Sequence, residues 1–249
     1  SSGKKYKLCL VVCSKCKLIQ VKNKIKPSKL FLNYKHFSSA SIDQVNHLKK
    51  LSLLFKKNKK YKKILEIGSN DNSLIKNFDN KNYFCCSIDP SVKKNLSKQN
   101  VIYKKFFNFK LEKKINKEHG NFDLIYAINV VPHVENLRSV LKGISLLLKD
   151  KGRVVIEGVY LLNNISKGLF DTLYHEHVSN FSFYSLNFAL KQFNLKIIDG
   201  SLIKTQGGSF RAICVKDSNH AKLLISTRLK KILKKENEIN INKRELYTK

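Results

Sequence analysis

The sequence predicts an α/β fold in which a mostly parallel sheet carries helices on both of its faces. Short apolar strands alternate with helical segments from Lys62 onward, as in sheets of this type. The first strand runs into a polar turn with a single glycine, over residues 64–71 (ILEIGSND), where ligands of such sheets bind. Residues 174–177 (YHEH) then bring together several groups able to hold or move protons. A ligand-binding turn followed by such a cluster indicates an enzyme.

The segments that precede the sheet are short and varied. Residues 13–21 (CSKCKLIQV) have the pattern of a knuckle with two cysteines followed by a strand. Residues 27–41 show no clear period, which predicts a loop. Residues 45–60 are predicted to form a helix because their apolar side chains recur at helical spacing, at Val45, Leu48, Leu51, Leu54 and Phe55.

The alternating region supplies the first strands of the predicted sheet. Helices are expected to open at residues 74–78 and to follow Asp89-Pro90, where the chain is rich in Lys and Ser. An amphipathic helix is expected at residues 136–148, with a turn at 149–152. The strands are predicted at residues 62–67, 83–88, 101–103, 122–128 and 153–159.

The last third of the chain is predicted to complete the sheet. Residues 185–193 have helical spacing, and strands at 195–199 and 209–215 flank a loop at Gly207-Gly208. Residues 222–242 predict a basic helix with no following element to pack on, so we expect a helical linker at 216–249.

Composition limits the classes of protein that fit. The net charge is +31, but only five of the 49 basic residues are arginines, and phosphate or base recognition favours arginine. The lysines are spread along the chain, so a genome rich in A and T explains the charge better than a nucleic-acid-binding face. No apolar run is long enough for a membrane span, and no segment reads as a signal peptide. We therefore expect a cytoplasmic protein with no membrane partner.

Cysteine usage agrees with a reducing compartment. Cys85, Cys86 and Cys214 lie in apolar segments and are interpreted as buried small hydrophobes. Only Cys13 and Cys16 have the spacing of a metal or redox pair.

The glycine turn points to a nucleotide-type cofactor. It lacks the G-x-G-x-x-G pattern of dinucleotide-binding folds. An acidic residue, Glu66, before the single Gly68 better suits a ligand that carries an amino acid and a ribose. Asp89 ends the second strand, where its carboxylate could accept from the ribose hydroxyls. These features resemble the S-adenosylmethionine site of class I methyltransferases, and Asn70 and Asn129 complete the expected cofactor-binding set.

The 174–177 cluster is compatible with two local geometries. In an extended segment Tyr174 and Glu176 would share one side and His175 and His177 the other, whereas in a helix Tyr174 and His177 would share a face. An imidazole titrates near neutral pH and can take a proton in either geometry. The cluster lacks the helical spacing of zinc-hydrolase motifs, which argues against a metal site.

Several segments together resemble the sugar C-methyltransferases, which include enzymes acting on nucleotide-linked 4-keto-deoxysugars. The matching order covers roughly residues 9–215. The segments are Cys13-x-x-Cys16 with residues 18–20, residues 33–39 (NYKHFSS), 66–71, 129–134 (NVVPHV), Glu157 with 160–162, 170–177 (FDTLYHEH) and 207–211 (GGSFR).

The resemblance implies a Rossmann-like class I methyltransferase fold with a mostly parallel seven-stranded sheet. It implies a nucleotide-sugar substrate whose carbon next to the keto group loses a proton and is then methylated. His177 would be the base, and Tyr174 and Glu176 would orient it or bind the keto oxygen. The resemblance further places Tyr34, with His36, over the sugar. Arg211 would contact substrate phosphate or form a structural ion pair, and His175 would lie beside the substrate or serve the structure.

The same family usually binds one zinc ion through two C-x-x-C pairs, and this chain carries only Cys13 and Cys16. Half a site predicts a disordered or metal-free N-terminal segment. We expect residues 1–44 to form a partial zinc module and substrate lid, and residues 45–215 to form the methyltransferase domain. Two other classes stay open: a non-catalytic remnant that binds cofactor or partner proteins, and a nucleic-acid-binding or nucleic-acid-methylating protein. The sequence does not indicate an oligomeric state.

Overall fold

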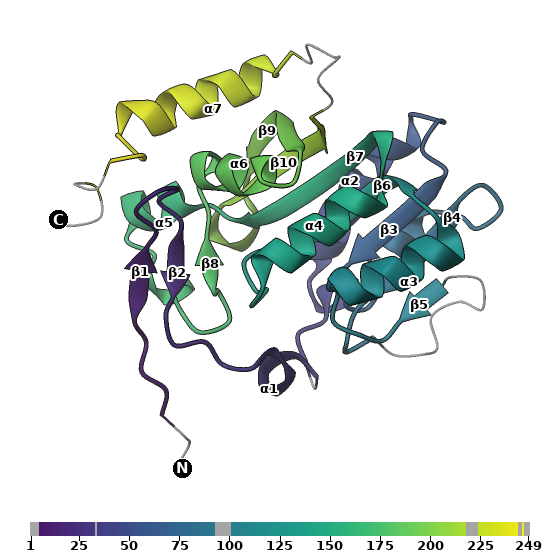
Figure 1. Ribbon diagram of the computed structural model, residues 1–249, viewed down its shortest axis with the longest axis horizontal. Helices are drawn as coiled ribbons and strands as arrows, with labels where there is room; N and C mark the ends of the chain where they lie inside the picture. Colours follow the sequence, from purple (N-terminus) through teal and green to yellow (C-terminus); the bar gives the residue numbers. More distant parts are fainter. Residues whose placement is uncertain (1–4, 33, 93–100, 218–223, 244–245, 247–249) are drawn as a thin grey trace.

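The computed structural model describes residues 5–32, 34–92, 101–217, 224–243 and 246, and its centre is a seven-stranded sheet (Figure 1). The strand order is β5-β4-β3-β6-β7-β10-β9. The strands from β5 to β7 are parallel, and β10 runs antiparallel to both of its neighbours. This confirms the predicted Rossmann-like sheet. The bounds are β3 (Lys63–Ile67), β4 (Phe84–Ile88), β5 (Val101–Tyr103), β6 (Phe122–Ile128), β7 (Leu148–Val159), β9 (Leu195–Ile203) and β10 (Ser209–Lys216).

Helices cover both faces of this sheet because its strands are apolar on both sides. Ile64 and Leu124 pack with α2 (Ile42–Lys56) on one face, whereas their neighbours Leu65 and Ile125 join the core on the other. Figure 1 shows α3 and α4 in front of the sheet, with α2 behind it. The helices of the second face are α3 (Phe109–His119), α4 (Leu137–Leu147), α6 (Phe183–Lys191) and α7 (Thr227–Glu238).

A small second sheet joins the N-terminal segment to the region that follows the YHEH cluster. Strands β1 (Leu10–Val12) and β2 (Ile19–Val21) form a hairpin, and β2 pairs with β8 (Ser179–Asn180). A bridge between Tyr160 and Phe181 ties this region to the end of β7. The chain then passes through the short helix α1 (Pro27–Phe31) towards α2. Of the two alternatives predicted for the N-terminal segment, disordered or metal-free, the described part does not show the first.

Several local features differ from the sequence-based expectations. Residues 27–41 contain α1 and a single 3-10 turn, η1 (Ser38–Ala40), in place of a featureless loop. Helix α3 was not predicted, although Asn108 caps it and Gly120 ends it with a positive φ. Residues 74–78 form only the 3-10 turn η2 (Ile75–Asn77). The helix expected after Asp89-Pro90 falls largely on residues outside the described ranges.

The predicted turn at residues 149–152 lies inside a strand. Phe122 pairs with Leu148 and Leu124 pairs with Arg153, so the intervening residues of β7 bulge out opposite Asp123. A lone glycine in a strand is a common sign of such a bulge, and Gly152 lies here. Leu54 of α2 is exposed, so it does not belong to the predicted buried stripe.

Helix α7 has a packing partner, contrary to the expectation for this segment. Leu229 is buried against the main core, and the Ser226 N–H donates to the carbonyl of Ile198 in β9. Glu236 accepts hydrogen bonds from the N–H groups of Phe183 and Tyr184, at the start of α6. The described part of the predicted helix is thus part of the folded unit. Within the described ranges no helix is long and apolar enough to cross a membrane.

Three shorter elements complete the described structure. Helix α5 follows the end of β7, and η3 comes directly before the cluster. The turn η4 lies in the loop between β9 and β10. Their bounds are α5 (Leu161–Lys167), η3 (Phe170–Thr172) and η4 (Thr205–Gly207).

Candidate functional site

A cavity of about 1110 Å³ lies beyond the carboxyl ends of β3, β4 and β6. It therefore lies at the edge where ligands bind in open α/β sheets. The structure brings all five residues predicted for cofactor binding to its wall. These are Glu66, Gly68, Asn70, Asp89 and Asn129.

The turn after β3 (residues 68–72, here the β3 turn) has a backbone that few side chains tolerate. Gly68 has a φ of +69°, and a Cβ there would lie 2.4 Å from a methyl carbon of Val130. Asn70 and Asn72 have φ values of +51° and +60°, a region that asparagine enters more readily than most residues. Asparagine thus supplies the left-handed conformation at both positions.

Two carboxyl groups of the cavity wall are held in different ways. Glu66 is buried and accepts from the Ile75 N–H at 3.1 Å. Burial raises its pKa well above the ordinary value, and the charges of Asp71 and Asp89 add to the rise, so this carboxyl is held towards its neutral form. Asp89 accepts from the Asn70 N–H on Oδ2 (2.9 Å) and from the Ser91 N–H and Oγ on Oδ1 (2.7 and 2.6 Å).

These bonds limit what Asp89 can still bind. A carboxylate offers roughly four acceptor sites, and three are used here. One further donor can therefore bind without rearrangement, and a second would have to replace the Ser91 hydroxyl. The predicted contact with both hydroxyls of a ribose requires that exchange.

Unpaired polar atoms mark the same end of the cavity. Asn129 has a φ of +54°, its N–H donates to the carbonyl of Glu157 at 3.0 Å, and its side-chain oxygen is buried. Within the described residues, neither this oxygen nor the Ser69 hydroxyl has a hydrogen-bond partner. Buried polar atoms are costly to leave unpaired, so these two indicate where a polar ligand docks.

Among the described residues, the cavity wall includes His133 but not the predicted residues Tyr174, Glu176 and His177. The ring of His177 lies beside that of His133 and is held by one of its nitrogens. Its Nδ1 lies 2.6 Å from the carbonyl of Thr172. Because a carbonyl can only accept, Nδ1 carries the proton and Nε2 of the neutral ring presents a lone pair. Burial lowers the pKa of His177, against the opposing effects of the Thr172 hydrogen bond and the Glu176 charge. The ring is thus unprotonated at Nε2 at neutral pH.

A second imidazole, His133, stands beside the first and lines the cavity. The ring centroids of His133 and His177 are 4.9 Å apart. Nδ1 of His133 lies 2.8 Å from the carbonyl of Glu176, so its Nε2 is also a lone pair. Burial, then the neighbouring His177, lowers the pKa of His133 to about 4. His133 was not among the predicted site residues; its position just beyond the end of β6 is the signal that could have found it.

The YHEH cluster adopts a turn, in which Tyr174 and His177 lie together. The His177 N–H donates to the Tyr174 carbonyl at 3.0 Å, and their ring centroids are 4.5 Å apart. Burial, then the charge of Glu176 and the presence of Tyr34, raises the pKa of Tyr174 to about 12. His175 points elsewhere: its ring contacts Tyr6, and its Nε2 lies 3.4 Å from the Lys7 carbonyl.

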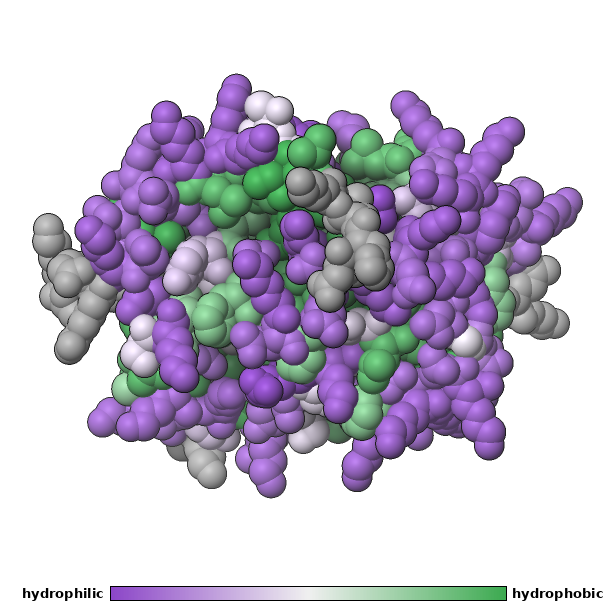
Figure 2. Space-filling model, turned by 45° about the horizontal axis from the view of Figure 1, so that its top comes forward, coloured by the Kyte–Doolittle hydropathy of each residue, from purple (hydrophilic) through white to green (hydrophobic). Residues whose placement is uncertain are grey.

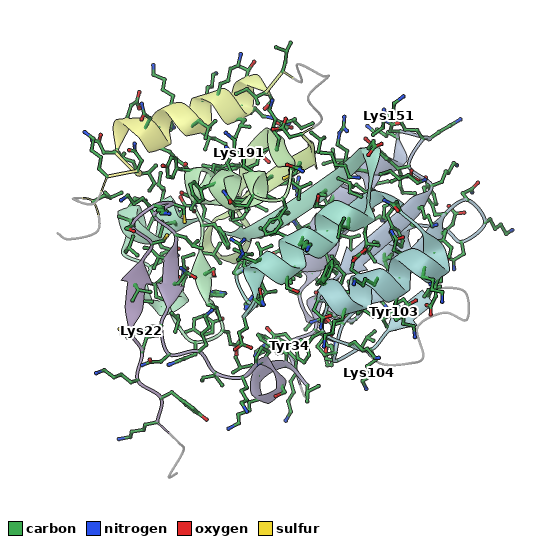
Figure 3. The ribbon with its side chains drawn as sticks, in the orientation of Figure 1. Lys22, Tyr34, Tyr103, Lys104, Lys151 and Lys191 are labelled. Carbon is green, nitrogen blue, oxygen red and sulfur yellow. The ribbon has the colours of Figure 1, made fainter. Side chains whose placement is uncertain are left out.

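Tyr34 lies next to helix α1 (Figure 3). It is half-buried in the cavity wall beside His36 and Phe31, with ring centroids 5.5 Å away in both cases. Burial raises its pKa, and the charges of Glu176 and Asp89 contribute to the rise. The charges of both carboxylates therefore act on this hydroxyl.

Arg211 occupies one of the two roles left open by the sequence. Its guanidinium donates to Glu157, whose other oxygen lies 2.7 Å from Nε2 of His47. This buried group links α2 to β7 and β10. In this structure Arg211 forms a structural ion pair, and the sequence patterns gave no indication of His47.

The cysteine pair of the N-terminal segment is close-packed but incomplete as a metal site. The hydrogen bond from the Cys16 N–H lowers the pKa of Cys13, whereas burial raises that of Cys16. Across the described ranges, no three His, Cys, Asp or Glu residues are grouped so that they could hold a metal ion. Cys13 and Cys16 therefore remain half of the predicted zinc site.

Comparison with solved structures supports the fold assignment. Magnesium protoporphyrin IX methyltransferase from Synechocystis, solved with bound SAH, superposes with a TM-score of 0.52 at 11% identity, over 71% of this chain and 88% of that one. The 1,6-didemethyltoxoflavin-N1-methyltransferase of Burkholderia thailandensis gives a TM-score of 0.53 at 11% identity, over 72% of this chain and 83% of that one. Both share the architecture described above.

Sequence comparison is more specific. C-methyltransferase NovU of Streptomyces niveus is 27% identical over 212 residues, which cover 82% of this chain and 50% of the relative. The chain thus spans half the length of this curated relative. The family model described as "Methyltransferase domain" matches residues 36–199, which include the β3 turn, Asp89 and both imidazoles. With the sheet, the turn and the family model in agreement, this chain belongs to the methyltransferase domain family.

Proposed function

We propose that this protein is an S-adenosylmethionine-dependent C-methyltransferase that acts on a nucleotide-activated keto-deoxysugar. One observation carries the proposal. The cavity is lined by the β3 turn and Asp89 and also by His133, whose ring centroid lies 4.9 Å from that of His177. Methylation of a carbon next to a ketone needs a methyl donor and a base close together, and this arrangement supplies a place for both.

The β3-turn end fits the proposed donor. Gly68 allows close approach, and the unpaired Asn129 Oδ1 suits the ammonium group of an amino acid. The unpaired Ser69 hydroxyl can donate to its carboxylate, and Asp89 is placed for the ribose. When bound, S-adenosylmethionine supplies a methyl group activated by a sulfonium centre.

His177 is the proposed base. Its Nδ1 proton is held by the Thr172 carbonyl, so Nε2 is the atom that accepts the proton from the acceptor carbon. Its lowered pKa keeps the ring unprotonated at neutral pH. His133 presents a second lone pair beside it and stays neutral far into the acid range.

The phenols are the proposed stabilisers of the enolate oxygen. Removal of the carbon proton develops negative charge on the keto oxygen, and fixed donors aimed at that oxygen stabilise it. The raised pKa values of Tyr174 and Tyr34 keep both hydroxyls protonated at neutral pH, as a donor requires. Glu176 contributes its carbonyl to His133, which fixes that ring.

The cavity volume and the relative support the proposed acceptor. Pockets for one small ligand typically measure about 300–1,000 Å³, so a cavity of about 1110 Å³ has room for a donor and an acceptor together. NovU, which this chain resembles, is described as a C-methyltransferase. The sugar nucleotide is proposed from the collinear segments around residues 33–39 and 170–177.

The test measures donor binding and proton abstraction separately. Calorimetry with S-adenosylhomocysteine should show binding that Asp89→Ala weakens. Deuterium exchange at the carbon next to the ketone of a nucleoside diphosphate-linked 4-keto-deoxysugar should fall about a hundredfold or more in His177→Asn, as for loss of a general base. His175→Asn is the matched control, because His175 lies against Tyr6. Unchanged exchange in His177→Asn would remove His177 from the role of base.

A further inference from the structure

Residues 34–41 (here the strap) connect helix α2 to the part of the cavity near His133, where the acceptor is proposed to bind (here the acceptor end). At one end Tyr34 lines the cavity, and at the other the Ser41 side chain accepts from the Gln44 N–H and caps α2. Apart from the turn η1, the described strap has no regular hydrogen-bonded structure of its own. Its position therefore depends on the contacts that it makes with other segments.

Two side chains of the β3 turn form hydrogen bonds with the strap backbone. The Asn70 side chain donates from Nδ2 to the His36 carbonyl at 2.8 Å and accepts from the Ser38 N–H at 3.4 Å. Asp71 Oδ2 accepts from the Ser39 N–H at 2.8 Å. Three side chain–backbone hydrogen bonds thus join the β3 turn to the strap.

Asn70 also contacts the donor end of the cavity, through its backbone and not its side chain. Its backbone N–H donates to Asp89 Oδ2 at 2.9 Å, while its amide faces the strap. The positive φ of Asn70 allows both contacts at once. One residue therefore joins the carboxylate proposed for the ribose to the segment that carries Tyr34.

Asp71 is held as an acceptor. Burial tends to raise its pKa, but hydrogen bonds from Ser39 and Ser73 outweigh that effect and bring the pKa below the ordinary value. The side chain is thus an ionised acceptor at neutral pH, and bonds to an ionised acceptor are stronger than neutral ones.

We propose that Asn70 and Asp71 are positioning residues for the acceptor: they hold the strap so that Tyr34 faces the acceptor end, and occupation of the donor end strengthens that hold. This inference rests on the proposed function for the identities of donor and acceptor. It gives the Asn70 side chain a role distinct from the cofactor contact predicted from the sequence.

The test uses Asn70→Gly, which keeps the positive φ and the N–H to Asp89 but removes the amide. Amide hydrogen exchange of Ser38 and Ser39, followed by NMR, reports the hold on the strap. Without ligand, exchange at these amides should be about two- to tenfold faster in the variant, as expected for lost neutral hydrogen bonds. S-adenosylhomocysteine should slow this exchange further in the unmodified protein and have less effect in the variant.

Steady-state kinetics distinguish a role in positioning the acceptor from a purely structural role. With the donor saturating, the acceptor KM of Asn70→Gly should rise by about two- to tenfold while donor Kd changes little. Asp71→Ala should act in the same direction, and Asp71→Asn, which keeps an acceptor oxygen, should restore part of the strap protection.

Asn72→Gly is the matched control for conformational freedom in the turn. Asn72 also has a positive φ, and within the described residues its side chain has no hydrogen-bond partner. This variant should leave the exchange of Ser38 and Ser39 unchanged. Equal exchange in the unmodified protein and Asn70→Gly would overturn the inference, as would acceleration by Asn72→Gly of the same size. Absence of S-adenosylhomocysteine binding to the unmodified protein would instead contradict the proposed function.

Discussion

At the scale of single residues, the chemistry of the site depends on which ring nitrogen carries the proton in His133 and in His177. In each ring, the Nδ1–H donates a hydrogen bond to a backbone carbonyl. His133 donates to the carbonyl of Glu176, and His177 donates to that of Thr172. Both rings therefore present Nε2 as a lone pair. Their lowered pKa values keep the pair uncharged near neutral pH, so that both Nε2 lone pairs are available to accept a proton.

This protonation state predicts the pH dependence of proton exchange. The pKa of His177 is lowered from 6.5, and the base works only when unprotonated. Exchange at the acceptor carbon should therefore stay level as the pH falls to 6.5 and decline only in more acid solution. NMR of deuterium uptake at a series of pH values measures this profile, with circular dichroism to verify folding at each point. An inflection clearly above 6.5 in the unmodified protein would contradict the assignment, and His175→Asn should give the same profile.

The sequence identified one imidazole of this pair and not the other. His177 lies in a dense motif, so its chemistry was visible in the residue pattern. His133 stands alone after a strand, and its role depends on the fold bringing it against a residue far along the chain. His47 escaped notice for the same reason, since only the packing of α2 against β7 brings it to Glu157.

At the scale of elements, the buried carboxyl of Glu236 attaches helix α7 to the body of the protein. It accepts from the first N–H groups of α6, on Phe183 and Tyr184, and from the Tyr160 hydroxyl. Helix N-termini carry unpaired N–H groups and a partial positive charge, so a carboxylate satisfies both. One side chain thus connects α7, α6 and the end of β7.

Removing that carboxyl should destabilise the whole domain. Glu236→Ala leaves buried donors without partners, which typically costs about 1–3 kcal/mol. Urea unfolding followed by circular dichroism measures the loss. Glu238→Ala is the control from the same helix, because Glu238 is exposed and pairs only with Lys234 at 3.8 Å among the described residues. An equal, small effect of both substitutions would show that α7 docking depends little on Glu236.

Element prediction succeeded where apolar periodicity was strong. The alternation of strands and helices predicted the sheet, and the spacing of residues 136–148 predicted α4. Helix α3 was missed because it is rich in lysine and its buried apolar residues are Leu111 and Ile115, too few for a clear helical period. The bulge at residues 149–152 has the composition of a turn, and only pairing with β6 shows that the strand runs through it.

At the scale of the whole molecule, the charge of +31 needs an interpretation. Hydrophilic side chains cover most of the face shown in Figure 2, with small hydrophobic areas between them. Arg211, which is partly buried, is used in an ion pair with Glu157. A dispersed lysine surface attracts polyanions in general and carries no means of reading sequence.

Duplex DNA should therefore bind weakly and without selectivity. Fluorescence anisotropy with two unrelated duplexes of equal length should give the same Kd for both. Affinity should fall steeply with salt, by about a thousandfold or more between about 50 and 200 mM if several phosphates are contacted. A clear preference for one duplex that persists in salt would favour the nucleic-acid-binding alternative over the compositional explanation.

The positive φ angles also bear on how such sites are detected. Among the described residues, five of the six non-glycine residues with positive φ are asparagines. Glycine codons begin with two guanines and asparagine codons with two adenines, so drift towards A and T exchanges one for the other while preserving the backbone shape. Gly68 remains in the β3 turn, where a Cβ would collide with Val130. Genomic base composition can thus erase a glycine-rich signature without altering the binding loop that it encodes.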